Sequence, residues 1–230
     1  PERHAEVLAR TGYVPERLHL YPSLTVGEAI RFHRQFYSTW DQAWANELMK
    51  QMQLEGDRRV GVLSKGESGK LMMLLALSQR PDMLVLDEPT DGLDPVVRRD
   101  ILAALVEYVT DREATVLISS HLVHELERIC DWVGLMDKGR LVAEMPMLEF
   151  KTGLKRLRVA SAPDSLSGAP FTLLVRDRGN GSVEQWLVRG WAPAMQTYLE
   201  SVGASLREVI DLDLEEGFVE MLRASRQRTG

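Results

Sequence analysis

Cysteine is nearly absent from this 230-residue sequence, in which Cys130 is the only one. A single cysteine excludes an internal disulfide and a multi-cysteine metal cage, and it favours a reducing compartment. Long apolar runs are missing as well. The longest, Leu71–Leu77, is far shorter than the roughly 18 residues that suggest a membrane-spanning helix. Residues 1–4 include neither an initiator Met nor a signal-peptide core, so we expect a cytoplasmic protein whose N-terminus is a cut end.

Positive charge is in deficit: 28 Lys and Arg stand against 34 Asp and Glu, for a net charge of −6. Because neutralising phosphates requires clustered Lys and Arg, an acidic chain without a basic stripe is a poor candidate for binding nucleic acid. Hydrophobic residues (44%) and charged residues (27%) are present in ordinary amounts, which is typical of a globular protein. We therefore expect a folded core and no nucleic-acid partner.

Helical spacing of apolar residues marks the first part of the chain. It predicts two helices, Val26–Phe36 and Trp44–Met52, with Thr25 and Asp41 as their N-caps. A stretch of small, polar, Pro- and Gly-rich residues falls much later, at 159–170, and predicts a linker.

Two short apolar runs, Met83–Leu86 and Thr115–Ile118, are separated by a helical pattern over residues 96–109. This order predicts a βαβ unit with buried parallel strands. Beyond the linker, Phe171–Val175 and Val183–Val188 flank an Asn-Gly pair, which is a strong signal for a β-hairpin. The C-terminal part therefore reads as a small α+β appendage.

Two carboxylates, Asp87 and Glu88, follow the first of these buried strands. Open α/β sheets place their ligands at the carboxyl ends of strands, and a charge at a core edge is costly unless a cation or water compensates it. We expect Asp87 to hold a hydrated Mg²⁺ and Glu88 to orient and deprotonate a water, as phosphoryl transfer requires. The alternative is a strand-to-turn cap in which Asp87 binds backbone amides.

Three further segments carry polar groups, and one of them, at His121, is expected at the same sheet edge as Glu88. Gly92–Pro95 reads as a turn that leads into a helix, and His121 follows the second strand, where its ring could reach a terminal phosphate. Leu63–Glu67 is a short loop that opens a helix, and exposed amides at a helix start can bind anions. Taken singly, each has a plainer interpretation as a turn, a polar turn residue or an ordinary helix start.

Taken in order, these segments closely resemble the second half of an ATP-binding cassette (ABC) nucleotide-binding domain. Leu63–Glu67 resembles the signature loop, Leu84–Glu88 the Walker B strand with its catalytic glutamate, Gly92–Pro95 the D-loop and His121 the switch histidine. Gly12–Glu16 resembles the Q-loop. The resemblance covers residues 10–155, and the C-terminal segment around Leu214–Val219 is similar to cassettes of ABC-2 exporters.

The chain departs from the family pattern in its Q-loop, its signature loop and its phosphate loop. Glu16 stands where glutamine is usual; in the signature loop, Lys65 replaces the first glycine and Glu67 the usual glutamine. Lys65 could still neutralise phosphate charge. No Gly-x-x-x-x-Gly-Lys-Ser/Thr sequence occurs; Gly66–Leu71 imitates it, but Leu71 cannot bind Mg²⁺ and no buried strand precedes the segment. We interpret the chain as a cassette that lacks its Walker A portion.

The resemblance implies an α/β fold of the P-loop NTPase-like kind, in which a parallel sheet carries an inserted helical subdomain and is truncated at its N-terminus. It implies an ABC ATPase domain over residues 1–158, a linker over 159–170 and the α+β appendage over 171–230. The implied function is an ATP-binding and ATP-hydrolysing subunit that, with ATP and Mg²⁺, couples closure of two cassettes to a transmembrane permease at the inner face of the membrane. The implied catalytic residues are Glu88, His121 and Asp94; those that contact nucleotide are Ser64, Lys65, Gly66, Glu67 and Glu16; those that hold metal are Asp87, through water, and Glu16.

Two alternatives remain open at this level. The chain could be a non-enzymatic half-site that contributes only signature and D-loop surface to a complete partner cassette, as the missing phosphate loop suggests. It could instead be an ABC ATPase of DNA repair or of the ribosome without a permease, although a single cassette without a basic linker argues against that reading.

Overall fold

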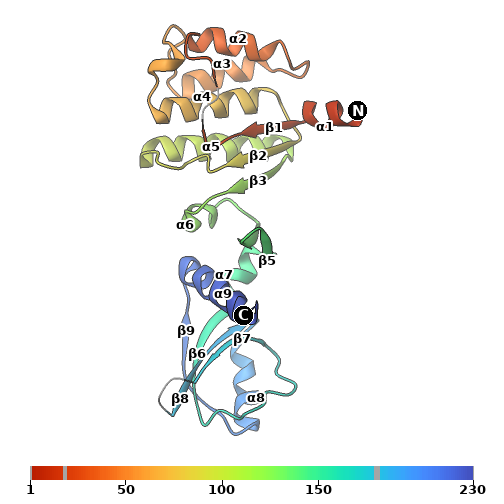
Figure 1. Ribbon diagram of the computed structural model, residues 1–230, viewed down its shortest axis with the longest axis vertical. Coiled ribbons are helices and arrows are strands. Elements are labelled where there is room, and N and C mark those ends of the chain that lie inside the picture. The colour runs from red at the N-terminus through yellow and green to blue at the C-terminus, as the bar shows by residue number, and fades with distance from the viewer. Residues whose placement is uncertain (1, 18–19, 179–181, 230) are drawn as a thin grey trace. The chain divides into compact units, whose positions relative to one another are not determined.

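A computed structural model describes residues 2–17, 20–178 and 182–229 of the chain (Figure 1). The chain forms two compact units, Pro1–His121 and Leu122–Gly230, called here the first and second units. The elements of the first unit are α1 (Glu2–Ala9), β1 (Thr11–Val14), α2 (Val26–Arg34), α3 (Gln42–Gln51), η1 (Val60–Val62), α4 (Lys65–Ser78), β2 (Met83–Asp87), α5 (Pro95–Arg112) and β3 (Thr115–Ser119).

The first unit is built on a parallel sheet with the strand order β1-β2-β3. In register, Val14 pairs with Leu86, and Leu86 pairs with Ile118. The helix α5 connects β2 to β3 and runs alongside the sheet (Figure 1). The predicted parallel pairing of the βαβ unit is therefore confirmed, and it brings the carboxyl ends of β2 and β3 to one edge of the sheet. The predicted burial is wrong for β3, because this strand lies at the end of the strand order: none of its five residues is buried, and Leu117 is 59% exposed.

The helices α2 and α3 begin at the two predicted N-caps. The Thr25 side chain accepts a hydrogen bond from the backbone N–H of Glu28, whose carboxylate in turn accepts from the Thr25 N–H, so a full capping box closes α2. The Asp41 carboxylate accepts from the Trp44 N–H at 2.9 Å and also binds the guanidinium of Arg80. Side-chain oxygens thus satisfy helix-start amides that would otherwise lack a partner.

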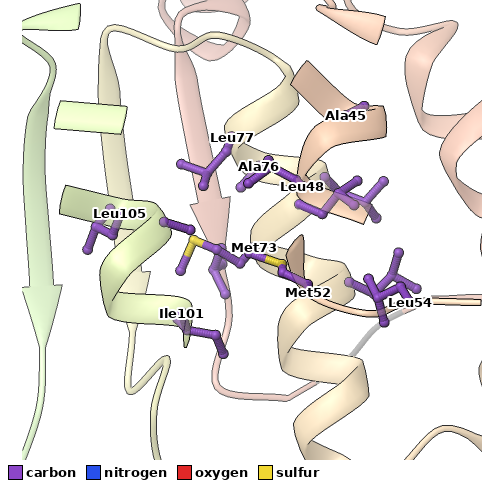
Figure 2. Close-up of a cluster of buried hydrophobic side chains, with 14 of the residues drawn as sticks. Ala45, Leu48, Met52, Leu54, Met73, Ala76, Leu77, Ile101 and Leu105 are labelled. Atoms are coloured by element: carbon purple, nitrogen blue, oxygen red, sulfur yellow. The ribbon is translucent and has the colours of Figure 1, made fainter. Parts of the chain in front are cut away.

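The core of the first unit centres on α4, which is buried over most of its length. Figure 2 shows how side chains from α3 and α5 gather around those of α4. The residues labelled there are Ala45, Leu48, Met52 and Leu54 from α3 and the turn that follows it, Met73, Ala76 and Leu77 from α4, and Ile101 and Leu105 from α5, all of them buried. The Met-rich stretch of α4 thus contributes to the core.

One charged group is enclosed with these apolar side chains. The Lys70 ammonium donates to Asp100 Oδ2 at 3.0 Å and to the Met52 carbonyl at 3.2 Å, and the side chain is only 10% exposed. Lys70 therefore lies within the buried part of a helix and is occupied by an ion pair. Gly66–Leu71 is part of the helix α4 and does not form a phosphate-binding loop, as its sequence predicts.

The second unit contains an antiparallel sheet with the order β7-β8-β6-β9 and a separate hairpin, β4-β5. The predicted hairpin corresponds to β7 and β8; its tip at 179–181 lies outside the described residues. The elements of the second unit are α6 (Val123–Leu126), β4 (Trp132–Asp137), β5 (Arg140–Pro146), α7 (Met147–Gly153), β6 (Leu154–Ala160), β7 (Thr172–Asp177), β8 (Val183–Arg189), η2 (Pro193–Met195), α8 (Gln196–Ser201), β9 (Ser205–Asp211) and α9 (Leu214–Thr229).

The division of the chain differs from the one predicted at residue 158 with a linker over 159–170. β6 pairs on one side with β8 and on the other with β9, so residues 154–160 belong to the C-terminal sheet. The stretch from 161 to 171 is irregular, but it joins two strands of that sheet. The compact units divide instead between His121 and Leu122.

In the described part of the chain, we find no helix that combines the length and apolar character needed to span a membrane.

Truncating a side chain at the centre of the first unit tests this packing. Leu77 of α4 is fully buried, so Leu77→Ala should lower the free energy of unfolding by about 2–5 kcal/mol through lost transfer energy and the cavity left behind. Val106 of α5 is 45% exposed, and Val106→Ala should change it by about 0.5 kcal/mol or less. Urea unfolding followed by circular dichroism measures both; equal losses would contradict the described core.

Candidate functional site

The site begins where β2 and β3 end side by side. Asp87 pairs in register with Ser119, and the Ser119 hydroxyl donates to Asp87 Oδ1 at 2.7 Å. The same hydroxyl oxygen accepts a hydrogen bond from the Glu88 N–H at 3.0 Å. Ser119 therefore fixes both the Asp87 carboxylate and the backbone of the residue that follows it.

Glu88 and His121 are brought into direct contact at this edge. The imidazole Nδ1 lies 2.9 Å from Glu88 Oε2, and the His121 backbone N–H donates to the same oxygen at 3.3 Å. Glu88 has a φ of 46°, which lies in the left-handed region and is unfavourable for a non-glycine residue. Strain of this kind persists only where the surroundings enforce it, and here it turns the carboxylate toward the imidazole.

The first turn of α4 contains the other predicted binding residues. The Ser64 side chain accepts from the Glu67 N–H at 3.2 Å, while Glu67 Oε2 accepts from the Ser64 N–H at 2.8 Å, so a capping box closes this helix as well. The backbone hydrogen bond from Ser64 is the largest effect that lowers the pKa of Glu67, and an ion pair with Arg58 acts in the same direction. The positive end of the helix dipole lies here, where it favours an anion.

Gly66 packs closely against Val97 of α5. A Cβ at Gly66 would lie 3.3 Å from both methyl carbons of Val97, closer than side chains normally pack. A glycine is therefore needed here for the packing of the two helices, in addition to the expected access of an anion to the backbone.

Lys65, which is expected to neutralise phosphate charge, has an internal partner in this structure, and its expected role stays a prediction. Its ammonium lies 2.9 Å from Asp91 Oδ2, and this hydrogen bond is the largest effect that lowers the pKa of Asp91. The other carboxylate oxygen, Asp91 Oδ1, lies 3.7 Å from His121 Nε2. Gly92 has a φ of +62°, and a Cβ there would collide with the Lys65 ammonium.

Two predicted residues are not joined to Glu88. Asp94 is the N-cap of α5, and its carboxylate accepts from the N–H groups of Val96 and Val97 at 3.0 and 3.1 Å. Glu16 lies exposed just beyond β1, and among the described residues no hydrogen bond or ion pair holds it. A catalytic role for Asp94 and a metal-binding role for Glu16 remain predictions.

Ser119 and Asp91 belong to the cluster but are not singled out by the sequence pattern. A usable signal exists for Ser119, because a polar residue that ends the strand beside β2 must lie opposite Asp87. No comparable signal exists for Asp91, whose partner Lys65 is 26 residues away along the chain.

The oxygen atoms at this sheet edge could coordinate a hard cation that retains most of its water ligands. Within the described ranges, no group of three or more His, Cys, Asp or Glu side chains is arranged to hold a metal ion. Asp87, with Oδ1 bound by Ser119, still presents oxygen donors beside a hydroxyl. Mg²⁺ is commonly held by one or two carboxylates together with water and substrate phosphates, so these residues fit Mg²⁺ and do not form a closed protein cage.

Together, the parallel sheet, the carboxylates at its edge and the capped helix start form an α/β domain with polar groups at the carboxyl ends of its strands. Residues 2–91 match the ABC transporter family. The chain is a homologue of ABC transporter ATP-binding proteins, as the resemblance of its motifs predicts.

Individual relatives agree with this assignment. The chain is 26% identical to the ABC transporter ATP-binding protein YtrB of Bacillus subtilis, over 98% of this chain and 77% of YtrB. It is 35% identical to the Nod factor export ATP-binding protein I of Burkholderia lata (63% of this chain, 49% of that protein) and 31% identical to the bacitracin transport ATP-binding protein BcrA of Bacillus licheniformis (64% and 48%). The chain thus spans about half the length of the last two relatives.

A solved structure supports the fold. The structure described as an ATP-binding subunit of an ABC transporter matches with a TM-score of 0.59 and 26% identity, over 65% of this chain and 64% of that one. The predicted α/β class with a parallel sheet is confirmed.

Removing the hydroxyl of Ser64 tests the cap of α4. Ser64→Ala should lower the free energy of unfolding by about 1 kcal/mol, because the Glu67 N–H loses its acceptor. Ser64→Asp supplies another good N-cap acceptor and should remain near the wild-type value. Thermal and urea unfolding measure both; a loss of the same size in Ser64→Asp would contradict the capping role.

Acidification tests the charge on Glu67. Since the pKa of Glu67 is lowered in the folded chain, its ionised form contributes stability above the unfolded pKa of about 4.3, and this contribution disappears as the pH falls through the lower folded value. Glu67→Gln keeps a neutral acceptor for the capping box. The melting-temperature difference between wild type and Glu67→Gln should therefore shrink from pH 7 to pH 3.5; a constant difference would count against the assignment.

Proposed function

We propose that this chain is an ATP-binding and ATP-hydrolysing subunit of an ABC transporter, with Glu88 as the general base. The observation that carries the proposal is the contact between Glu88 and His121, 2.9 Å apart beside Asp87 at the end of β2. A carboxylate held by an imidazole at a sheet edge can accept a proton from a water molecule, and we place the terminal phosphate beside this pair.

The other residues of the cluster prepare this step. Ser119 holds the Asp87 carboxylate, which would bind Mg²⁺ through water, and the ion would neutralise phosphate charge. The start of α4 offers Ser64 and the neighbouring backbone amides to phosphate oxygens. His121 keeps the Glu88 carboxylate in one orientation through two contacts with the same oxygen. These residues position groups and stabilise charge, which is the main work of phosphoryl transfer.

The partners follow from the family. We propose that two cassettes close on each other around ATP, that the start of α4 faces the nucleotide held mainly by the opposite cassette, and that this closure drives a membrane-embedded permease. The chain would then act at the cytoplasmic face of a membrane. Two relatives are named for Nod factor export and for bacitracin transport; because these cargoes differ, neither is transferred to this chain.

A second candidate follows from one property of the sequence. None of the 230 residues belongs to a Gly-x-x-x-x-Gly-Lys-Ser/Thr sequence, the loop that grips the β- and γ-phosphates in this class. In this alternative the chain supplies only the α4 start and the D-loop to a complete partner cassette. It predicts hydrolysis that needs the partner and that does not depend on Glu88 of this chain.

The test is ATP hydrolysis by the protein produced from its complete gene, with and without its partner cassette. Glu88→Gln should lower kcat by about 10²–10⁴-fold, because the amide cannot accept the proton, while Mg-ATP binding is retained. Glu47→Gln removes a carboxylate from an exposed position on α3 and serves as the matched control. Wild-type turnover in Glu88→Gln would overturn the proposal and favour the half-site alternative.

A further inference from the structure

Four side chains form a continuous polar row from the start of α4 to the general base. The Lys65 ammonium lies 2.9 Å from Asp91 Oδ2, Asp91 Oδ1 lies 3.7 Å from His121 Nε2, and His121 Nδ1 lies 2.9 Å from Glu88 Oε2. The row therefore joins the helix start expected to meet an anion to the carboxylate expected to activate water.

We infer that Asp91 is a positioning residue for His121, and that Lys65 controls how closely the Asp91 carboxylate approaches the imidazole. The inference rests on the proposed function for its catalytic meaning, whereas the geometry stands without it. Each imidazole nitrogen faces one carboxylate, Glu88 on Nδ1 and Asp91 on Nε2. With a proton on each nitrogen the imidazole can donate to both carboxylates, which only accept, and once both hydrogen bonds are made it cannot turn without losing one of them.

The contact with Lys65 explains why the Asp91 carboxylate and His121 Nε2 are too far apart for a hydrogen bond. The 3.7 Å separation of Asp91 Oδ1 from Nε2 exceeds an ordinary hydrogen bond by roughly 0.8 Å. Asp91 presents its other oxygen to Lys65 at hydrogen-bond distance, and the lysine side chain passes over Gly92, where a Cβ would collide with it. The ammonium thus holds the carboxylate slightly away from the ring.

An anion at the start of α4 would change this balance. A phosphate group placed beside Ser64 competes with Asp91 for the Lys65 ammonium, because both are anionic acceptors of the same N–H donors. Asp91, released from Lys65, would keep two neighbours, the backbone N–H of Gly92 and the imidazole of His121. Its carboxylate would then close on Nε2 and hold the ring against Glu88, so that occupancy at α4 is transmitted to the general base within one chain.

Imidazole ¹⁵N resonances test the contact without relying on catalysis. The chain contains five histidines, and His121→Gln identifies which signals belong to His121. Lys65→Gln should shift the Nε2 resonance of His121 toward its hydrogen-bonded position, and Asp91→Asn should shift it the opposite way. In the Asp91→Asn background, Lys65→Gln should have no further effect, since its action passes through Asp91.

Matched controls separate this effect from a general change of charge. Lys50→Gln and Asp57→Asn alter exposed residues outside the cluster and should leave the His121 signals unchanged. Asp91→Glu keeps the carboxylate, so its Nε2 resonance should lie closer to the wild-type position than that of Asp91→Asn. Unchanged Nε2 signals in both Lys65→Gln and Asp91→Asn, or equal effects of Lys65→Gln in the two backgrounds, would overturn the inference.

Steady-state kinetics on the protein from its complete gene add the catalytic readout. Asp91→Asn should lower kcat for ATP about tenfold, as loss of an orienting partner does, with KM changed by less than about twofold. Unchanged kcat in Asp91→Asn, with hydrolysis still dependent on Glu88, would refute the positioning role while leaving the proposed function intact. Absence of Glu88-dependent hydrolysis, with the resonance shifts as expected, would refute the proposed function while leaving the Lys65–Asp91–His121 contact intact.

Discussion

The first unit depends on the burial of α4 among α3, α5 and β1. Ten of the fourteen residues of this helix are buried, so its position is set by contacts on almost every side. The Lys70 ammonium lies within this core, whereas its partner Asp100 is 33% exposed. Removing Asp100 would leave a buried charge without its partner, which is far costlier than losing an exposed ion pair. Since Ser64 and Lys65 belong to the first turn of the same helix, the core also determines where these polar groups stand.

The register of the parallel strands determines where Glu88 and His121 lie. β2 and β3 end opposite each other at Asp87 and Ser119, so the residues that follow each strand, Glu88 and His121, emerge at one edge. The left-handed backbone of Glu88 then turns its side chain toward the ring. The sheet brings Glu88 and His121 close together, and the strained turn directs the Glu88 carboxylate toward the ring. Both are needed for the 2.9 Å contact.

Local signals in the sequence predicted much of this. The apolar runs located β2 and β3, the polar residues Thr25 and Asp41 located two helix starts, and the order of motifs identified Glu88 and His121. The Lys65–Asp91 pair was not predictable, because it joins segments far apart in sequence whose approach depends on packing of α4 against α5. The division after His121 was missed for a similar reason: β6 follows the ATPase motifs in sequence but finds both strand partners, β8 and β9, later in the chain.

The two glycines in the first half of α4 have a mechanical consequence. Gly66 packs against Val97, and a Cβ at Gly69 would lie within 3.5–4.0 Å of Ile101 and Leu93, so side chains of α5 and of the turn before it pack directly on the backbone of α4. Little sliding or tilting of one helix start is possible without the other, because close-packed contacts leave no slack. A displacement imposed on Ser64 would therefore be carried to Asp94 at the start of α5, and the two helix ends would move as one rigid piece.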